Sequence, residues 1–261
     1  MHRSAWTILI PLVFGFTSTA WAQQRLPDHR TISHVASGGG WKTVMTLVNL
    51  SSAAASVTVT FQDDTGLALT LPLVVTQAGA SQSQVASEVT RVIAGLATLR
   101  IESEAPAASA TLTGWADVIS LGSFAGFAIF RQRGSDGRDS EGTAPLESTN
   151  VAALMVPYDN SDGFSTGIAI VNTGSARVSL VAIVRDEEGI VLGQYGVPMI
   201  ARSHTAFVVG DRLPASVGRR GNIEVQFIGN TVATSTLTAI GLRFSPAGTF
   251  TSVPVVPVAV R

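Results

Sequence analysis

The sequence contains no cysteine, which excludes disulfide bridges and cysteine-ligated metal sites. Charged side chains make up only 13% of the 261 residues, and lysine and glutamate are scarce. The 17 basic and 18 acidic residues are nearly balanced, and no basic stripe or aromatic-basic pattern interrupts that balance. We therefore expect no nucleic-acid partner. Stability must come from buried apolar surface, which the 46% hydrophobic content can supply.

Long hydrophobic runs are also missing. The apolar stretch "ILIPLVFGF" near the N-terminus is about half as long as a membrane span requires. With Arg3 before it and small residues Ala20 and Ala22 after it, residues 1–22 are predicted to be a signal peptide cleaved before Gln23. No later stretch is long enough to span a bilayer. The mature chain of 239 residues is therefore expected to be secreted or periplasmic, with no membrane span.

Helical periodicity is almost absent, whereas strand patterns recur along the chain. Alternating or β-branched runs, each bounded by turn residues, include "SVTVTFQ" (56–62), "ATLRIES" (97–103), "RVSLVAIVRD" (177–186) and "NIEVQFIG" (222–229). Only residues 86–95 and 209–216 favour a helical turn or two. This pattern predicts an all-β protein.

The chain repeats itself. Residues 40–66 align without a gap on residues 163–189, at an offset of 123, and nine of the 27 positions are identical. In this alignment Trp41 matches Phe164, and we expect both rings to be buried at equivalent core positions. Internal repeats of this length define two structural units. The predicted fold is two tandem immunoglobulin-like antiparallel β-sandwiches after an N-terminal signal peptide.

The repeat also predicts the domain boundaries. An N-terminal tail is expected over 23–30, the first sandwich over 31–147 and the second over 153–261. Two shorter matches, "TLT" (111–113 with 236–238) and "AIFR" with "IGLR" (128–131 with 240–243), lower the offset from 125 to 112. This change predicts an insertion of 13 residues in the first copy, within 114–126.

Several segments are similar to a known group of proteins. Phe130-Arg131-Gln132, residues 141–146, Pro157-Tyr158-Asp159-Asn160 and Gly163-Phe164 resemble segments of uncharacterised exported bacterial proteins built of two tandem β-sandwich repeats. The resemblance covers most of the mature chain. It implies the two-repeat β fold and export, and it implies no catalytic residue.

The stretch "VPYDNSDGFSTGIAIVN" (156–172) carries two patterns with chemical meaning. Asp159 and Asp162 precede Gly163 as in an oxygen-rich ion loop. A calcium loop of the EF-hand type with Gly163 in sixth place would need a carboxylate in twelfth place, where Ala169 stands. A turn explains these residues, and a looser calcium site on Asp159 and Asp162 stays open.

The same stretch contains Gly163-Phe164-Ser165-Thr166-Gly167, which matches the G-x-S-x-G pattern of a hydrolase nucleophile elbow. That elbow joins a strand to a helix, whereas Ser165 opens a predicted strand. Asp186 and His204 follow in the order of an α/β-hydrolase, but the alternating strands and helices of that fold are missing. The pattern is therefore interpreted as coincidence, and no catalytic residue is predicted.

The predicted insertion holds the remaining candidates. Trp115, Asp117, Phe124 and Phe127 fall in or beside it, and the repeat does not require them, so they are the candidate partner-binding residues. The competing interpretation is that the segment covers a sheet edge or the contact between the domains. The histidines are scattered, and we predict no metal site and no cofactor.

These observations favour an exported, non-enzymatic structural or interaction protein that binds a protein or glycan partner at the cell surface or in the periplasm. One alternative is a carbohydrate-binding module that uses Trp115 and the neighbouring aromatics. The other is a secreted serine hydrolase that uses Ser165.

Overall fold

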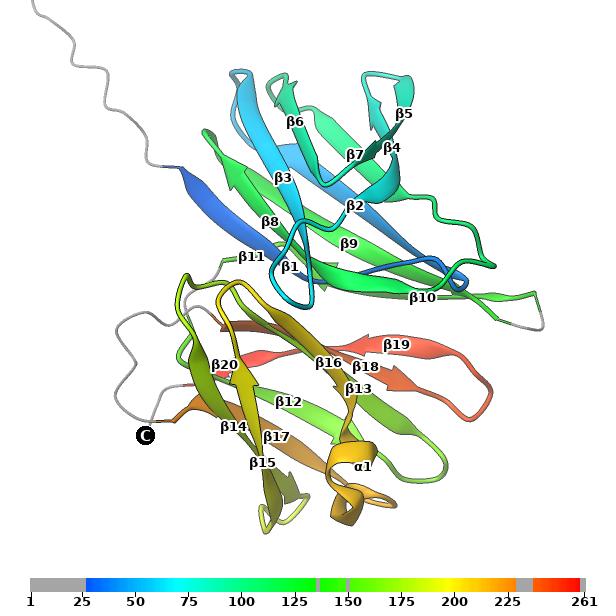
Figure 1. Cartoon of the computed structure of the whole chain (residues 1–261), viewed down its shortest axis with the longest axis vertical. Helices are drawn as coiled ribbons and strands as arrows, with labels where there is room; N and C mark the ends of the chain where they lie inside the picture. The colour runs from blue at the N-terminus through cyan, green and yellow to red at the C-terminus, as the bar shows by residue number, and fades with distance from the viewer. Residues whose placement is uncertain (1–26, 135–136, 149–150, 229–236, 259–261) are drawn as a thin grey trace, which may run out of the picture.

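A computed structural model describes residues 27–134, 137–148, 151–228 and 237–258. In these residues four antiparallel sheets form two β-sandwiches, one above the other along the long axis (Figure 1). The predicted class, all-β with two tandem immunoglobulin-like antiparallel sandwiches, is confirmed. The predicted signal peptide, residues 1–22, lies outside the described residues. No helix in the described ranges is long and apolar enough to cross a membrane.

The first sandwich contains strands β1 to β11. One sheet has the order β11 (Glu147–Ser148), β1 (Asp28–Ser37), β8 (Leu112–Ser120), β3 (Ala55–Asp63) and β6 (Glu88–Ile93). The other has the order β10 (Asp139–Pro145), β9 (Phe124–Arg133), β2 (Trp41–Asn49), β7 (Thr98–Ser103), β4 (Leu71–Gln77) and β5 (Ala80–Ala86). Strand β1 begins at Asp28, inside the stretch that the sequence assigned to the tail.

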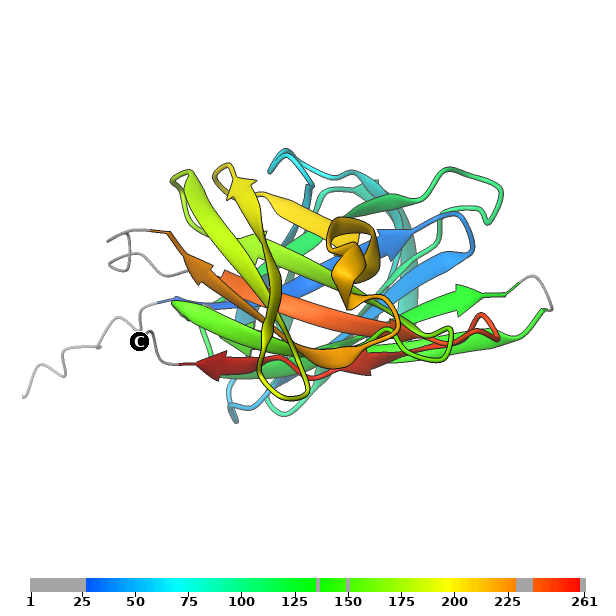
Figure 2. The same ribbon diagram turned by 90° about the horizontal axis from the view of Figure 1, so that it is seen from below.

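The second sandwich contains strands β12 to β20. One sheet has the order β15 (Val191–Met199), β14 (Val178–Asp186), β17 (Arg220–Phe227), β12 (Ala153–Asp159) and β20 (Val256–Val258). The other has the order β16 (His204–Val208), β13 (Ser165–Asn172), β18 (Leu237–Phe244) and β19 (Phe250–Val253). A short helix α1 (Val209–Arg212) and a 3-10 turn (Pro214–Ser216) lie on the side away from the first sandwich (Figure 2).

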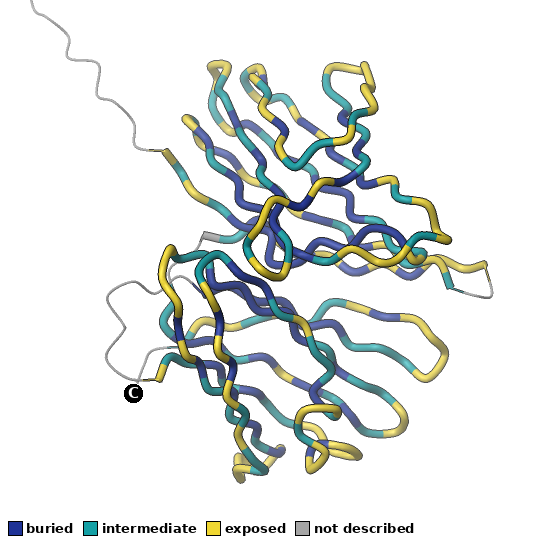
Figure 3. Tube along the Cα trace, viewed as in Figure 1, coloured by how far each residue is buried: buried dark blue, intermediate teal, exposed yellow. Residues whose placement is uncertain are grey.

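The sequence alternation explains the cores. In β3 the apolar side chains of Val57, Val59 and Phe61 are buried, and the intervening threonines are half-exposed. Successive side chains of a strand point to opposite faces, so each such strand presents one apolar face to the partner sheet. Burial is accordingly greatest between the sheets and where the two sandwiches meet, and it is least at the loop ends (Figure 3).

The outer face of the sheet formed by β9, β2 and β7 carries ion pairs. The Lys42 ammonium lies 3.6 Å from a carboxylate oxygen of Glu102 and 3.3 Å from one of Glu104. Arg100 also pairs with Glu102, and Arg131 pairs with Glu141 on β10. Charged groups are costly to bury, so this face stays in contact with water.

The strand pairing corrects the predicted insertion. Val57 on β3 and Leu180 on β14 are equivalent at the offset of 123, but their neighbours across the ladder, Arg91 on β6 and Val197 on β15, differ by only 106. The first copy therefore has 17 more residues between these strands, and the hairpin β4–β5 occupies that place. The prediction of an insertion within 114–126 was wrong, because the short Thr-Leu-Thr match aligned the start of β8 with the start of β18.

The expected burial of Trp41 and Phe164 was wrong too, since both rings are only half-buried. Trp41 lies 5.1 Å from the Phe250 ring of the second sandwich. Phe164 lies 3.5 Å below the Arg243 guanidinium, measured to the ring centroid. Equivalent positions therefore have different roles, because one faces the other sandwich and the other faces an ion-pair cluster.

A buried asparagine closes the equivalent loop in each copy. Asn49 and Asn172 are equivalent at the offset of 123, and both are fully buried. The Asn49 amide donates to three backbone carbonyls, those of Ala53, Ile93 and Ala94. The Asn172 amide donates to the carbonyls of Ala176 and Ile200. Each side chain thus replaces the backbone donors that these loops lack, as buried carbonyls require.

We predict that Asn49→Ala lowers the free energy of unfolding by about 1–3 kcal/mol, since it leaves buried carbonyls without donors. Asn49→Asp keeps the acceptor for the Ser51 amide but removes the donors, so it should be at least as destabilising. Urea unfolding of both variants is the measurement. A parent-like midpoint for Asn49→Asp would show that the amide donors contribute nothing.

Candidate functional site

The most elaborate arrangement of side chains lies at the junction of the two sandwiches. One apolar cluster crosses it and joins core residues of the first sandwich with Ala169, Ile240, Leu242 and Phe250 of the second. The edge strands β10 and β19 lie side by side (Figure 1), and the Thr143 amide donates to the Ser252 hydroxyl at 3.3 Å. The junction is therefore part of the core as well as a contact surface.

The turn between β15 and β16 supplies the main polar contact. The Arg202 guanidinium donates to Gln62 Oε1 on β3 at 2.9 Å and to Asp117 Oδ2 on β8 at 2.8 Å. Its backbone carbonyl accepts from the Trp115 indole N–H at 3.0 Å, and the guanidinium carbon lies 5.3 Å from the Trp115 ring. Arg202 has a φ of +55°, an unusual conformation for a residue other than glycine. One residue thus binds three side chains of the other sandwich.

A glycine permits this close approach. Gly66, in the turn after β3, has a φ of +81°. A Cβ atom there would lie 2.8 Å from the carbonyl oxygens of Ala201 and Arg202, which is too close for any side chain. The sequence repeat conserves the turn glycine at Gly189, but only Gly66 contacts the other sandwich.

Two histidines and an aspartate continue the junction beside Arg202. Asp64 Oδ1 lies 2.8 Å from His204 Nδ1, and His204 Nε2 lies 3.0 Å from His34 Nδ1. Both rings are buried, with exposed fractions of 3% for His204 and 8% for His34. The hydrogen bond from His204 outweighs desolvation and lowers the pKa of Asp64. Burial, reinforced by neighbouring His204, lowers the pKa of His34 to about 3, so its ring is neutral at neutral pH.

Sequence reasoning missed this arrangement. The histidines were described as scattered, and neither Asp64 nor Arg202 was identified as a candidate. The hydrogen bonds among them join residues 140 to 170 positions apart in the chain. No spacing pattern in the sequence carries that information.

The structure places the four candidate partner-binding residues in different environments. Trp115 is fully buried and Asp117 is 7% exposed, and both contact Arg202. Phe124 is buried in the core of the first sandwich, and Phe127 on β9 is 40% exposed. Trp115 and Asp117 therefore follow the competing interpretation, contact between the domains, and the four residues do not form one surface.

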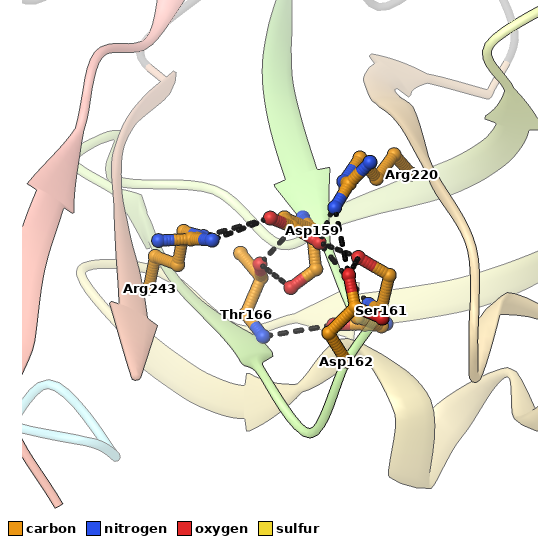
Figure 4. Close-up of polar contacts among 7 residues, drawn as sticks. Asp159, Ser161, Asp162, Thr166, Arg220 and Arg243 are labelled. Atoms are coloured by element: carbon orange, nitrogen blue, oxygen red, sulfur yellow. Dashed lines mark hydrogen bonds and ion pairs between the residues drawn. The ribbon is translucent and has the colours of Figure 1, made fainter. Parts of the chain in front are cut away.

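The stretch that was interpreted as a turn, with a looser calcium site left open on Asp159 and Asp162, carries an ion-pair cluster. Asp159, at the end of β12, accepts from Arg243 and Arg220 and from the Ser161 hydroxyl, and Asp162 accepts from Arg220 (Figure 4). Guanidinium groups thus occupy the positions where a calcium ion would bind Asp159. In the described part of the chain, no group of three or more candidate ligands is arranged to hold a metal ion.

Ser165 lies at one end of β13, and His204, on the neighbouring strand β16, lies beside the other end of β13. Ser165 is the first residue of β13, while His204 pairs with Val171, six residues further along. Six residues of strand span about 20 Å. Ser165 opens a strand rather than a helix, so the nucleophile-elbow geometry is not formed here.

No family model and no curated protein matches the chain. Among solved structures, it is similar to the M60 catalytic domain with the CBM51-1 and CBM51-2 domains from Clostridium perfringens ZmpB. The identity is 10% and the TM-score 0.21, and the match covers 75% of this chain and 32% of that one.

We predict that Arg202→Ala lowers the free energy of unfolding by about 1–3 kcal/mol, because the buried Asp117 carboxylate loses its charged donor. Arg133→Ala is the matched control, since the Arg133 side chain is 67% exposed. The control should change stability by less than about 0.5 kcal/mol. Equal effects of the two substitutions in denaturant unfolding would contradict a special role for Arg202.

The Asp159 cluster predicts a pH dependence. Burial alone would raise the pKa of Asp159, but hydrogen bonds from Ser161 and Arg243 prevail and lower it to about 2. A depressed pKa contributes stability that is complete above the ordinary value of 3.8 and is lost as the pH falls towards 2. The stability difference between the parent and Asp159→Asn should therefore shrink between pH 4 and pH 2, in urea titrations at each pH. A constant difference would contradict this assignment.

Proposed function

We propose that the chain is an exported, non-enzymatic interaction protein that binds a protein or glycan partner at the cell surface or in the periplasm. The observation that carries this proposal is the combination of one rigid two-sandwich body with an open, unprotected sheet edge on β5. The shared apolar cluster and the Arg202 contacts support a fixed arrangement. A fixed arrangement suits recognition of an extended partner, because little conformational freedom is lost on binding.

Strand β5, "ASQSQVA", is a sheet edge without the usual protection. It pairs with β4 on one side only, and it is the last strand of its sheet. Four successive residues from Ala80 are exposed, and Val85 is 74% exposed. The strand contains no charge and no proline, the features with which proteins block unwanted strand pairing.

Several other sheet edges carry such features, whereas β16 and β19 at the junction do not. Strand β6 contains Glu88 and Arg91, β10 contains Asp139 and Glu141, and β15 contains Pro198. The hairpin β4–β5 has no counterpart in the second sandwich, and it lies at the end of the first sandwich away from the junction (Figure 1). An open edge binds an extended segment by adding it as a further strand, so we favour a protein partner over a glycan.

The two alternatives have less support. A carbohydrate-binding module based on Trp115 would need a side chain that is fully buried at the junction. A serine hydrolase based on Ser165 would need a general base, and His204 lies at the other end of β13.

We predict that Ser83→Lys combined with Val85→Lys lowers partner binding at least tenfold, because the charges obstruct strand addition. Ile190→Lys with Val191→Lys is the matched control, since these residues are 62% and 55% exposed on the second sandwich. The measurement is binding of labelled protein to arrays of surface proteins and of glycans. Binding that survives the β5 substitutions, or that occurs only on glycans, would contradict the strand-addition mechanism.

A further inference from the structure

An apolar pocket of about 250 Å³ lies at the junction, between the first sandwich and the sheet β16-β13-β18 of the second. Its walls include Trp41, Phe207, Leu242 and Phe244, and small residues such as Ala206 leave the space open. Ala206 is exposed, so the pocket is reached from solvent beside β16. Among the described residues that line it, only the His34 side chain has a hydrogen-bond acceptor.

The second copy differs from the first in the side chains that β16 presents to this pocket. By strand pairing, Ala206 and Val208 on β16 are equivalent to Arg100 and Glu102 on β7. Side chains that form ion pairs in the first copy are thus replaced by small apolar ones in the second. The replacement both allows the sandwiches to pack and leaves a volume that the packing does not fill.

The hydrogen-bond chain sets the polarity of the pocket. An ionised Asp64 carboxylate can only accept, so it accepts a hydrogen bond from the N–H at His204 Nδ1, and with one proton on that ring His204 Nε2 is an acceptor. His204 Nε2 accepts a hydrogen bond from the N–H at His34 Nδ1, which leaves a lone pair on His34 Nε2. Nδ1 makes the one hydrogen bond of this ring to the described residues, so Nε2 has no partner there. Two neutral imidazoles can complete the chain in this direction only.

We propose that this pocket binds a small apolar molecule that carries one hydrogen-bond donor, such as a phenol or an aliphatic alcohol, with the donor on His34 Nε2. The low pKa of His34 keeps this acceptor available at neutral pH. His204 is the titratable group that is hydrogen-bonded to this ring, and Asp64 acts on the ring through its hydrogen bond to His204. Together they hold the tautomer of His34.

The size and the lining of the pocket fit this class of ligand. A dry apolar cavity of about 150 Å³ accommodates one benzene molecule, so about 250 Å³ accommodates a substituted ring or a short chain. A sugar would leave most of its hydroxyl groups without partners against these walls. The ligand is therefore chemically distinct from the macromolecular partner proposed for β5, and the two sites are independent.

Phenol and toluene test the proposal, because they are similar in size and only phenol has a hydroxyl group that can donate to His34 Nε2. In NMR titrations of the full mature chain, phenol should bind about 3- to 10-fold more tightly than toluene, the contribution of one neutral hydrogen bond. Shifted resonances should include Gly167 and Ala206. Equal affinities, or no binding of either at millimolar concentration, would overturn the proposal.

Two substitutions distinguish the contribution of the pocket volume from that of the His34 acceptor. Ala206→Leu fills the pocket from an exposed position and should weaken both ligands at least tenfold, whereas Ala125→Leu, on exposed β9 surface, should bind as the parent does. His34→Phe should make the affinities for phenol and toluene equal. Unchanged phenol binding in Ala206→Leu would overturn the proposal even if His34→Phe does not fold.

Discussion

Contact between the Arg202 turn and strands β3 and β8 determines how the two sandwiches are arranged. The Trp115 indole N–H and the Asp117 carboxylate are buried polar groups, and both find their hydrogen-bond partners on Arg202 of this turn. With the turn in place, His204, two residues further on, reaches Asp64 and His34. A polar contact of this kind specifies one arrangement, whereas the apolar cluster around it would tolerate small shifts. The buried apolar surface supplies most of the free energy that holds the sandwiches together, and the polar contacts fix their relative position.

The same junction separates two kinds of surface. The pocket lies where the sandwiches meet, and its single acceptor depends on residues of both. The β4–β5 hairpin lies at the opposite end of the first sandwich and depends on that sandwich alone (Figure 1). A partner added to β5 therefore need not disturb the pocket. The β5 edge depends on the inserted β4–β5 hairpin. The pocket needs no insertion, because it forms between the two copies.

The sequence was sufficient for features that depend on local pattern. Alternation predicted strands such as β3, and the gap-free repeat predicted two sandwiches. Matches of three or four residues were too short to establish register, so the insertion was assigned to β8 instead of β4–β5. The junction could not be predicted, because Arg202 and Asp117 are 85 residues apart and neither lies in a motif. Trp115 was noticed because it fell in the predicted insertion, which the strand pairing places elsewhere, and its burial follows from contact with the other sandwich.

The ion pairs on the outer face of β2, β7 and β9 have a consequence for assembly. The two sandwiches contact each other through non-equivalent surfaces, one on each. Contacts of this heterologous type can in general continue from one unit to the next without forming a closed ring. In the first copy the surface equivalent to the docking face carries Lys42, Arg100 and Glu102. Burying those charges would cost more than the new contact returns. These ion pairs therefore oppose the addition of a further unit to this face through the same kind of contact.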